Sequence, residues 1–171
     1  MRLSIIFQTL IISILTLTNV VNCDGKKDGG NEGVIALLAA NSISNLPKPD
    51  TDTVSMIVGG NYFTLTDKLD CKEGAGGIGF LMDDADQMPT LFIHNVDFSV
   101  NFGVNVTGGA GPFHVDIDTA SGTYFPTTTC PATIMENSLT TYDLQVVNCG
   151  VSPFGGGAAN TVSFRVRCTK D

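Results

Sequence analysis

A chain of 171 residues has room for one domain with an ordinary hydrophobic core, once a leader and a tether are set aside. Seventeen acidic residues against nine basic ones give a formal net charge of -8, which opposes binding to nucleic acid and to anionic lipid head groups. Because 43% of the residues are hydrophobic, disorder of the whole chain is also excluded.

The first 22 residues have the anatomy of a secretory signal peptide. A positive charge at Arg2 precedes an apolar run from Ile5 to Leu17, which is shorter than the roughly 20 residues needed to span a bilayer. Polar, glycine-rich sequence follows, so a transmembrane helix is not expected. Ordinary cleavage after Cys23, which would give a secreted protein without lipid, is an alternative that this leader leaves open.

The leader ends in Val20-Val21-Asn22-Cys23, which resembles the lipobox of bacterial lipoproteins in its relaxed, spirochaete-type form. Val20 stands at the first position of the motif, whereas Val21 and Asn22 are larger than its usual small residues. The resemblance implies a small lipoprotein whose Cys23 carries palmitate-type acyl chains. At about 0.8 kcal/mol per buried methylene, two or three chains would hold it on a membrane. The expected location is the cell envelope, at the outer membrane or the surface rather than the inner membrane.

Two connecting segments are predicted after the lipid site. Residues 23–33 contain four glycines and little apolar sequence, which predicts a flexible tether. Residues 34–40 combine apolar character with good helix formers, so we expect a short helix that packs on the domain or lies in the membrane interface. Pro47 and Pro49 then predict an extended linker up to residue 52, since proline disfavours helix at and before its own position.

Residues 53–171 predict an all-β domain, a disulfide-stapled antiparallel sandwich or partly closed barrel of roughly seven to nine short strands. Gly59-Gly60-Asn61 predicts the turn of a first hairpin. Strict alternation in residues 98–106 and 113–118, on either side of a glycine-rich turn, predicts a second hairpin in which Phe113, Val115 and Ile117 face inward. The other expected strands cover residues 54–58, 62–66, 78–82, 90–96, 132–135, 142–147 and 162–167.

Assigning Cys23 to lipid leaves four cysteines, which are expected to form disulfides in the oxidising compartment that export implies. If residues 132–135 pair with 142–147, Cys130 and Cys149 lie equally far from the turn and face one another. We therefore prefer Cys130 with Cys149 and, by elimination, Cys71 with Cys168; the other two connectivities stay open. A four-cysteine zinc site is disfavoured because the sequence has no Cys-x-x-Cys pair.

No cofactor, metal or catalytic constellation stands out in the sequence. His114 and Asp116 share one face of a predicted strand, and a metal could bridge them if His94 came alongside, but polar residues on a wet face are the favoured interpretation. Asp83, Asp84 and Asp86 lack the spacing of an EF-hand loop. No serine lies in a Gly-x-Ser-x-Gly motif.

The sequence therefore predicts a non-enzymatic binding or structural domain, attached to the membrane through its lipid, that binds another macromolecule of the envelope or of a host, with a protein as the expected partner. The alternative is a carrier of small apolar ligands, and a hydrolase with an unrecognised site is a third possibility. In the carrier, phenylalanines would line a cavity inside a closed sheet, namely Phe92, Phe98, Phe102, Phe113, Phe125, Phe154 and Phe164.

Overall fold

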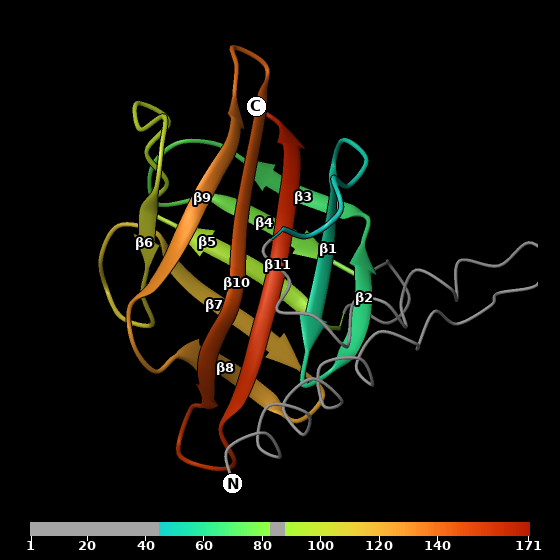
Figure 1. The fold of residues 1–171 in the computed structure, drawn as a ribbon, viewed down its shortest axis with the longest axis vertical. Helices are drawn as coiled ribbons and strands as arrows, with labels where there is room; N and C mark the ends of the chain where they lie inside the picture. Colours follow the sequence, from blue (N-terminus) through green and yellow to red (C-terminus); the bar gives the residue numbers. More distant parts are fainter. Residues whose placement is uncertain (1–44, 83–87) are drawn as a thin grey trace, which may run out of the picture. The chain divides into compact units, whose positions relative to one another are not determined.

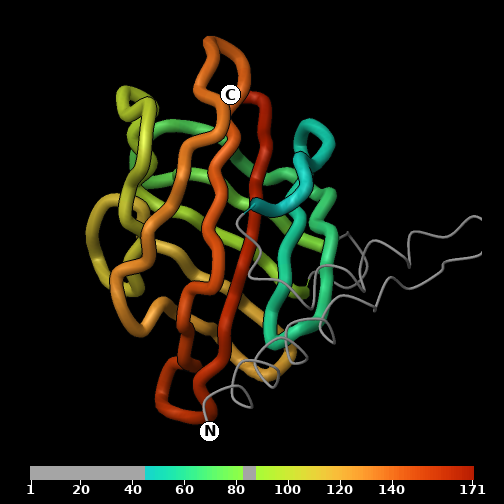
Figure 2. The backbone as a smooth tube through the Cα atoms, viewed as in Figure 1, coloured from blue at the N-terminus to red at the C-terminus, as the bar shows by residue number. Residues whose placement is uncertain are grey.

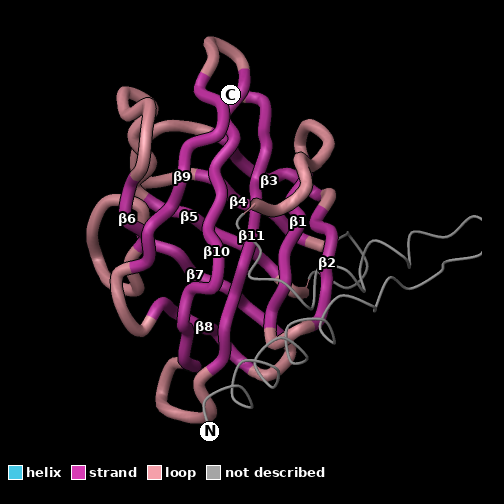
Figure 3. Tube along the Cα trace, in the orientation of Figure 1, coloured by secondary structure: helices cyan, strands magenta, loops and turns pink. Residues whose placement is uncertain are grey.

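The computed structural model of the chain describes residues 45–82 and 88–171. All of them belong to the second of two units, residues 37–171. The predicted signal peptide, Cys23, the tether and the helix at 34–40 lie outside the described residues, and so do Asp83, Asp84 and Asp86. The described part consists of strands and loops (Figure 3), and none of it is a helix with the length and apolar character needed to cross a membrane.

The described residues form eleven antiparallel strands, which confirms the all-β class. The count exceeds the expected one because two short strands, Asp67–Cys71 and Gly122–Pro126, carry no clear pattern in the sequence. The strands are β1 (Thr53–Val58), β2 (Asn61–Leu65), β3 (Asp67–Cys71), β4 (Ile78–Leu81), β5 (Thr90–His94), β6 (Val104–Val106), β7 (His114–Thr119), β8 (Gly122–Pro126), β9 (Cys130–Asn137), β10 (Thr141–Pro153) and β11 (Asn160–Thr169).

The sheet curves back on itself into a nearly closed barrel with two layers (Figure 1). The front layer has the order β2-β1-β11-β10-β9-β6, and the back layer has the order β8-β7-β5-β4-β3. Strand β10 joins the layers, since its first half pairs with β9 and its last residues pair with β8. Its register shifts between Val146 and Cys149, where Asn148 adopts a φ of 53°. The strands of the two layers cross in the backbone trace (Figure 2).

A disulfide and a set of hydrogen bonds hold β3 of the back layer to the end of β11, and we call this contact the seam. The disulfide joins Cys71 to Cys168. The Cys71 N–H donates to Asp171 Oδ2 at 2.8 Å, and Lys68 Nζ donates to Asp171 Oδ1 at 2.6 Å. The hydrogen bond from Lys68 lowers the pKa of the Asp171 carboxyl. The seam therefore fixes the two layers to each other with covalent and polar contacts.

The second disulfide, Cys130–Cys149, lies between β9 and β10. Strand β9 pairs with β10 from Ala132 opposite Val146 to Asn137 opposite Tyr142, as the expected hairpin does, but the register shifts by one residue between Asp143 and Leu144. Disulfide bonding is thus present: Cys130–Cys149 is the pair that the hairpin argument prefers, and Cys71–Cys168 is the pair preferred by elimination.

The interior is filled by side chains from alternate positions of both layers. Met56, Phe80, Ile93 and Phe164 are fully buried there, and Phe113, Val115 and Ile117 also face inward as expected. Alternation along each strand explains this, because every second residue of a half-buried strand faces the core. The β1–β2 hairpin is also confirmed, with Gly59 and Gly60 at positive φ values of 57° and 83° in its turn.

The predicted hairpin between residues 98–106 and 113–118 is wrong. Only β6 in the first segment is a strand, and it pairs with β9, whereas β7 pairs with β5 and β8. The preceding loop satisfies its backbone through side chains: the amide of Asn137 donates to the carbonyls of Phe98 and Val100 at 2.8 and 2.9 Å. These bonds satisfy carbonyls at the start of the segment, and the alternating pattern builds a strand only at its end, in β6.

Residues 45–50, which we call the strap, pack on the outer face of β10 and β11. The Leu46 N–H donates to Gln145 Oε1 at 2.6 Å, and Arg165 Nη1 donates to the Leu46 carbonyl at 3.0 Å. Arg165 also holds the fully buried Asp143 carboxylate through two bonds of 2.9 and 2.8 Å. Leu46 is only 2% exposed, so this predicted linker is extended but is part of the packed domain.

Candidate functional site

The outer face of the back layer carries an unusual set of side chains. Leu91 and Ile93 of β5 are buried in the core. Successive side chains of a strand point to opposite faces, so Phe92 and His94 face outward. The same alternation on β7 directs His114 and Asp116 to that outer face. Since β5 pairs with β7 with His94 opposite His114, both histidines of the chain lie side by side there.

Five rings form a continuous row across this face, which we call the aromatic strip. The strip consists of Phe92, His94, His114, Phe125 and Phe154, and the centroids of successive rings lie 6.0, 5.5, 6.1 and 6.0 Å apart. A side chain at Gly79 would come within 3.1 Å of the Phe92 ring, so the glycine gives that ring room to lie against β4. The row runs from half-buried Phe92 to Phe154, whose side chain is 84% exposed.

Asp116 lies between the two imidazoles of the strip. His94 Nε2 is 3.1 Å from Asp116 Oδ2, and His114 Nε2 is 2.7 Å from Asp116 Oδ1. The second contact is close but does not have hydrogen-bond geometry, and both of its atoms are shielded from solvent without another partner. The other nitrogen of His94, Nδ1, lies 3.4 Å from the Ala75 carbonyl oxygen.

The condition set by the sequence for a metal site, that His94 come alongside His114 and Asp116, is therefore met. The side chains are half-buried rather than fully wet, with 34% of His94 and about a fifth of the other two exposed. As they stand, the described residues contain no group of three or more His, Cys, Asp or Glu side chains already arranged to hold a metal ion.

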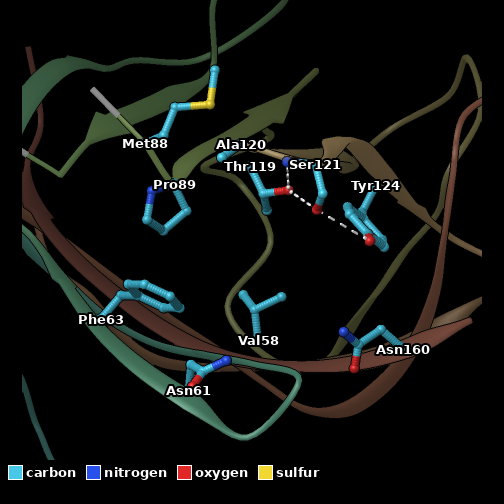
Figure 4. A pocket seen from close by; sticks show the side chains of 10 residues that line it. All are labelled: Val58, Asn61, Phe63, Met88, Pro89, Thr119, Ala120, Ser121, Tyr124 and Asn160. Carbon is cyan, nitrogen blue, oxygen red and sulfur yellow. Dashed lines mark hydrogen bonds between the residues drawn. The ribbon is translucent and has the colours of Figure 1, made fainter. Parts of the chain in front are cut away.

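A second feature is a pocket of about 450 Å³ between the β1–β2 turn, the β7–β8 turn and the start of β5 (Figure 4). Apolar groups from Val58, Phe63 and Tyr124 face it, together with Met88 and Pro89. Its polar lining comes from Asn61, Asn160, Thr119 and Ser121, and the hydroxyl oxygens of Thr119 and Ser121 lie within hydrogen-bond distance of each other, at 2.9 Å. The pocket is large enough for a small apolar molecule.

The seven phenylalanines that were expected to line a central cavity have different roles. Phe113 and Phe164 are buried in the core, and Phe98 is packed against it. Phe92, Phe125 and Phe154 belong to the aromatic strip, while Phe102 is 75% exposed on the loop before β6. None of the seven lines the pocket described above.

The sequence predicted neither the pocket nor the aromatic strip. Each depends on pairing between strands that are distant in the chain, and only the outward alternation at residues 113–118 gave a partial signal for the strip. Comparisons with family models, with curated proteins and with solved structures find no match to this chain.

Proposed function

We propose that the chain is a membrane-anchored lipoprotein whose β-domain has no enzymatic activity and binds another macromolecule through the aromatic strip. Acylation of Cys23 would attach it to the cell envelope, at the outer membrane or the cell surface, where an envelope or host protein is the expected partner. The net charge of -8 disfavours nucleic acid as that partner.

The aromatic strip is the observation that carries this proposal. Aromatic side chains dominate the energetics of protein interfaces, because each buries a large area at a small cost in conformational entropy. Phe154 is 84% exposed at one end of the strip, and its ring contacts Phe125 with centroids 6.0 Å apart. A row of rings on an open sheet face thus offers anchor residues that water solvates poorly.

The binding test compares three versions of the full chain as bait for cross-linked envelope extracts and host surface proteins. These are the native chain, the strip variant Phe92→Ala/Phe154→Ala, and the control Phe102→Ala, which removes a ring that is 75% exposed, against 84% for Phe154, from a different loop. We expect a partner that the native chain and the control recover and that the strip variant loses. Recovery of the same proteins by all three baits, or of none by the native chain, would refute a role for the strip.

The anchor is tested separately by mass spectrometry of the mature N-terminus. An acylated Cys23 supports the lipoprotein assignment. An unmodified cysteine, or a mature chain that begins after it, would replace the anchored protein with a secreted one and would leave the binding test unaffected.

The second candidate is a carrier of small apolar ligands, which the pocket beside Val58, Phe63 and Tyr124 favours. Its test is displacement of a fluorescent apolar probe from the native chain and from Val58→Phe, which reduces the volume of the pocket. Binding that the substitution weakens about tenfold supports a carrier, whereas equal binding by both chains argues against one.

A further inference from the structure

We propose that His94, His114 and Asp116 form a binding site for a divalent transition-metal ion on the outer face of the β5–β7 pair. The three side chains come from two neighbouring strands, with His94 directly opposite His114. Asp116 contributes a carboxylate oxygen within 3.1 Å of one imidazole nitrogen and 2.7 Å of the other. This site goes beyond the proposed macromolecular binding and stands or fails independently of it.

The orientation of His94 is the first argument. Its Nδ1 lies 3.4 Å from the Ala75 carbonyl oxygen and its Nε2 lies 3.1 Å from Asp116 Oδ2, and the tautomer of the ring decides which nitrogen donates. A metal ion bound at Nε2 would require the ring proton on Nδ1, where the Ala75 carbonyl can accept it. A backbone carbonyl on the second nitrogen is also the arrangement that orients metal-bound histidines.

The contact between His114 and Asp116 is the second argument. His114 Nε2 and Asp116 Oδ1 are 2.7 Å apart, yet neither makes a hydrogen bond although both are shielded from solvent. Two buried polar atoms without a partner need an explanation, and an ion bound by both, after a rotation of the carboxylate, would satisfy them.

The spacing of the rings is the third argument. With metal–nitrogen bonds of about 2.0–2.1 Å, two imidazoles bound through Nε2 to one tetrahedral ion have centroids roughly 5 to 5.5 Å apart. The His94 and His114 centroids are 5.5 Å apart. The carboxylate is the part that must move, because it now touches both imidazoles and the three ligands are not yet spread around one point. A small rotation of Asp116 would make room for the ion.

The ligand set determines the class of ion. Two imidazole nitrogens and one carboxylate oxygen suit zinc, copper, nickel or ferrous iron, whereas calcium and magnesium prefer oxygen ligands alone. The exposed third of the His94 side chain leaves a coordination position open to water or to a donor from another molecule. The cysteines of the domain do not compete, since Cys71, Cys130, Cys149 and Cys168 are all in disulfides.

The test is a zinc titration of the full chain by calorimetry, with its disulfides intact. We expect one zinc ion per chain and at least a roughly tenfold loss of affinity in His94→Ala and in His114→Ala. The matched control is Asp118→Asn, which alters the next outward carboxylate on β7 and should bind zinc like the native chain. Equal affinity of the native chain and the double variant His94→Ala/His114→Ala would overturn the proposal.

A second measurement does not depend on any variant. The chain has only two histidines, so the ring resonances of both should shift when zinc is added to the native protein. Visible absorption of the cobalt-substituted protein should show ligand-field bands of a site with nitrogen and oxygen ligands. Histidine resonances that stay unchanged at a saturating zinc concentration would contradict the proposal even if zinc bound elsewhere.

Discussion

The two outer faces of the barrel use polar side chains in opposite ways. On the front layer, the Asp143 carboxylate is fully buried, and its partner Arg165 also holds the strap through the Leu46 carbonyl. On the back layer, Asp116 is partly exposed between His94 and His114. A buried charge must keep its partner, whereas a partly exposed group can exchange it for water or a ligand. The front face therefore stabilises the domain, whereas the polar groups of the back face can take a new partner.

The largest expected effect comes from breaking the buried pair of the front face. Arg165→Ala leaves Asp143 buried without a partner and should reduce the free energy of unfolding by about 3–5 kcal/mol, measured by urea denaturation. The control is Lys48→Ala, which removes a long ion pair to Glu136 at 3.5 Å from an exposed lysine and should cost less than about 1 kcal/mol. A loss of less than about 1 kcal/mol of unfolding free energy in both variants would contradict the stabilising role of the buried pair on the front face.

Removing each disulfide tests how firmly the two layers are held together. Cys71 and Cys168 are separated by 97 residues, and Cys130 and Cys149 by 19. Because the longer loop restricts the unfolded chain more, Cys71→Ala/Cys168→Ala should lose about 1.5 kcal/mol more than Cys130→Ala/Cys149→Ala. Denaturation of both double variants gives the difference. A greater loss of unfolding free energy in Cys130→Ala/Cys149→Ala would show that the seam disulfide stabilises the domain less than its loop length predicts.

The polar part of the seam should depend on pH. The pKa of the Asp171 carboxyl is lowered by its hydrogen bond from Lys68, so its stabilisation is present above the unfolded-state pKa of about 3.9 and is lost as the pH falls through the lower folded-state value. Because 41% of the Asp171 side chain is exposed and water screens its ion pair, Asp171→Asn should cost less than about 1 kcal/mol at pH 7. The unfolding free energies of variant and native chain should converge in acid, and a constant difference down to pH 2 would contradict this account.

The smallest expected change in stability is at the exposed end of the aromatic strip. Phe154→Ala should change the free energy of unfolding by no more than about 0.5 kcal/mol, because its ring contacts mainly water and the edge of Phe125. The buried control Phe80→Ala should cost about 3–5 kcal/mol. A large loss in Phe154→Ala would mean that the strip is part of the structural core rather than a binding surface.

Local sequence predicted the parts of the fold that depend on local geometry. The β1–β2 hairpin follows from Gly59-Gly60, and the turn near Leu139 predicts the β9–β10 hairpin that the Cys130–Cys149 disulfide links. The register of this hairpin shifts by one residue between Asp143 and Leu144, which a symmetrical turn does not predict. The alternation of residues 98–106 led to a wrong hairpin. Alternation indicates which side chains would face the core, but it does not indicate which strand the segment pairs with. There, the side chain of Asn137, more than 30 residues away, supplies the hydrogen bonds that a strand would have made.

The candidate site could be predicted only in part for the same reason. Alternation correctly placed His114 and Asp116 on one outward face, but their approach to His94 required the register of β5 against β7. The contact of Phe125 with Phe154 likewise depends on β8 pairing with the end of β10, which no short segment of sequence encodes. The strip is therefore a product of the sheet order.

Photo-cross-linking in intact producing cells is the most direct test of the claim that the back face binds a partner. A benzoyl-phenylalanine replaces Phe154 in one chain and Leu139 in another, since Leu139 is 98% exposed but lies at the β9–β10 turn, away from the strip. A discrete adduct from position 154 that position 139 does not give is the result expected here. No adduct from position 154, or the same adducts from both positions, would contradict a binding surface on the outer face of the back layer.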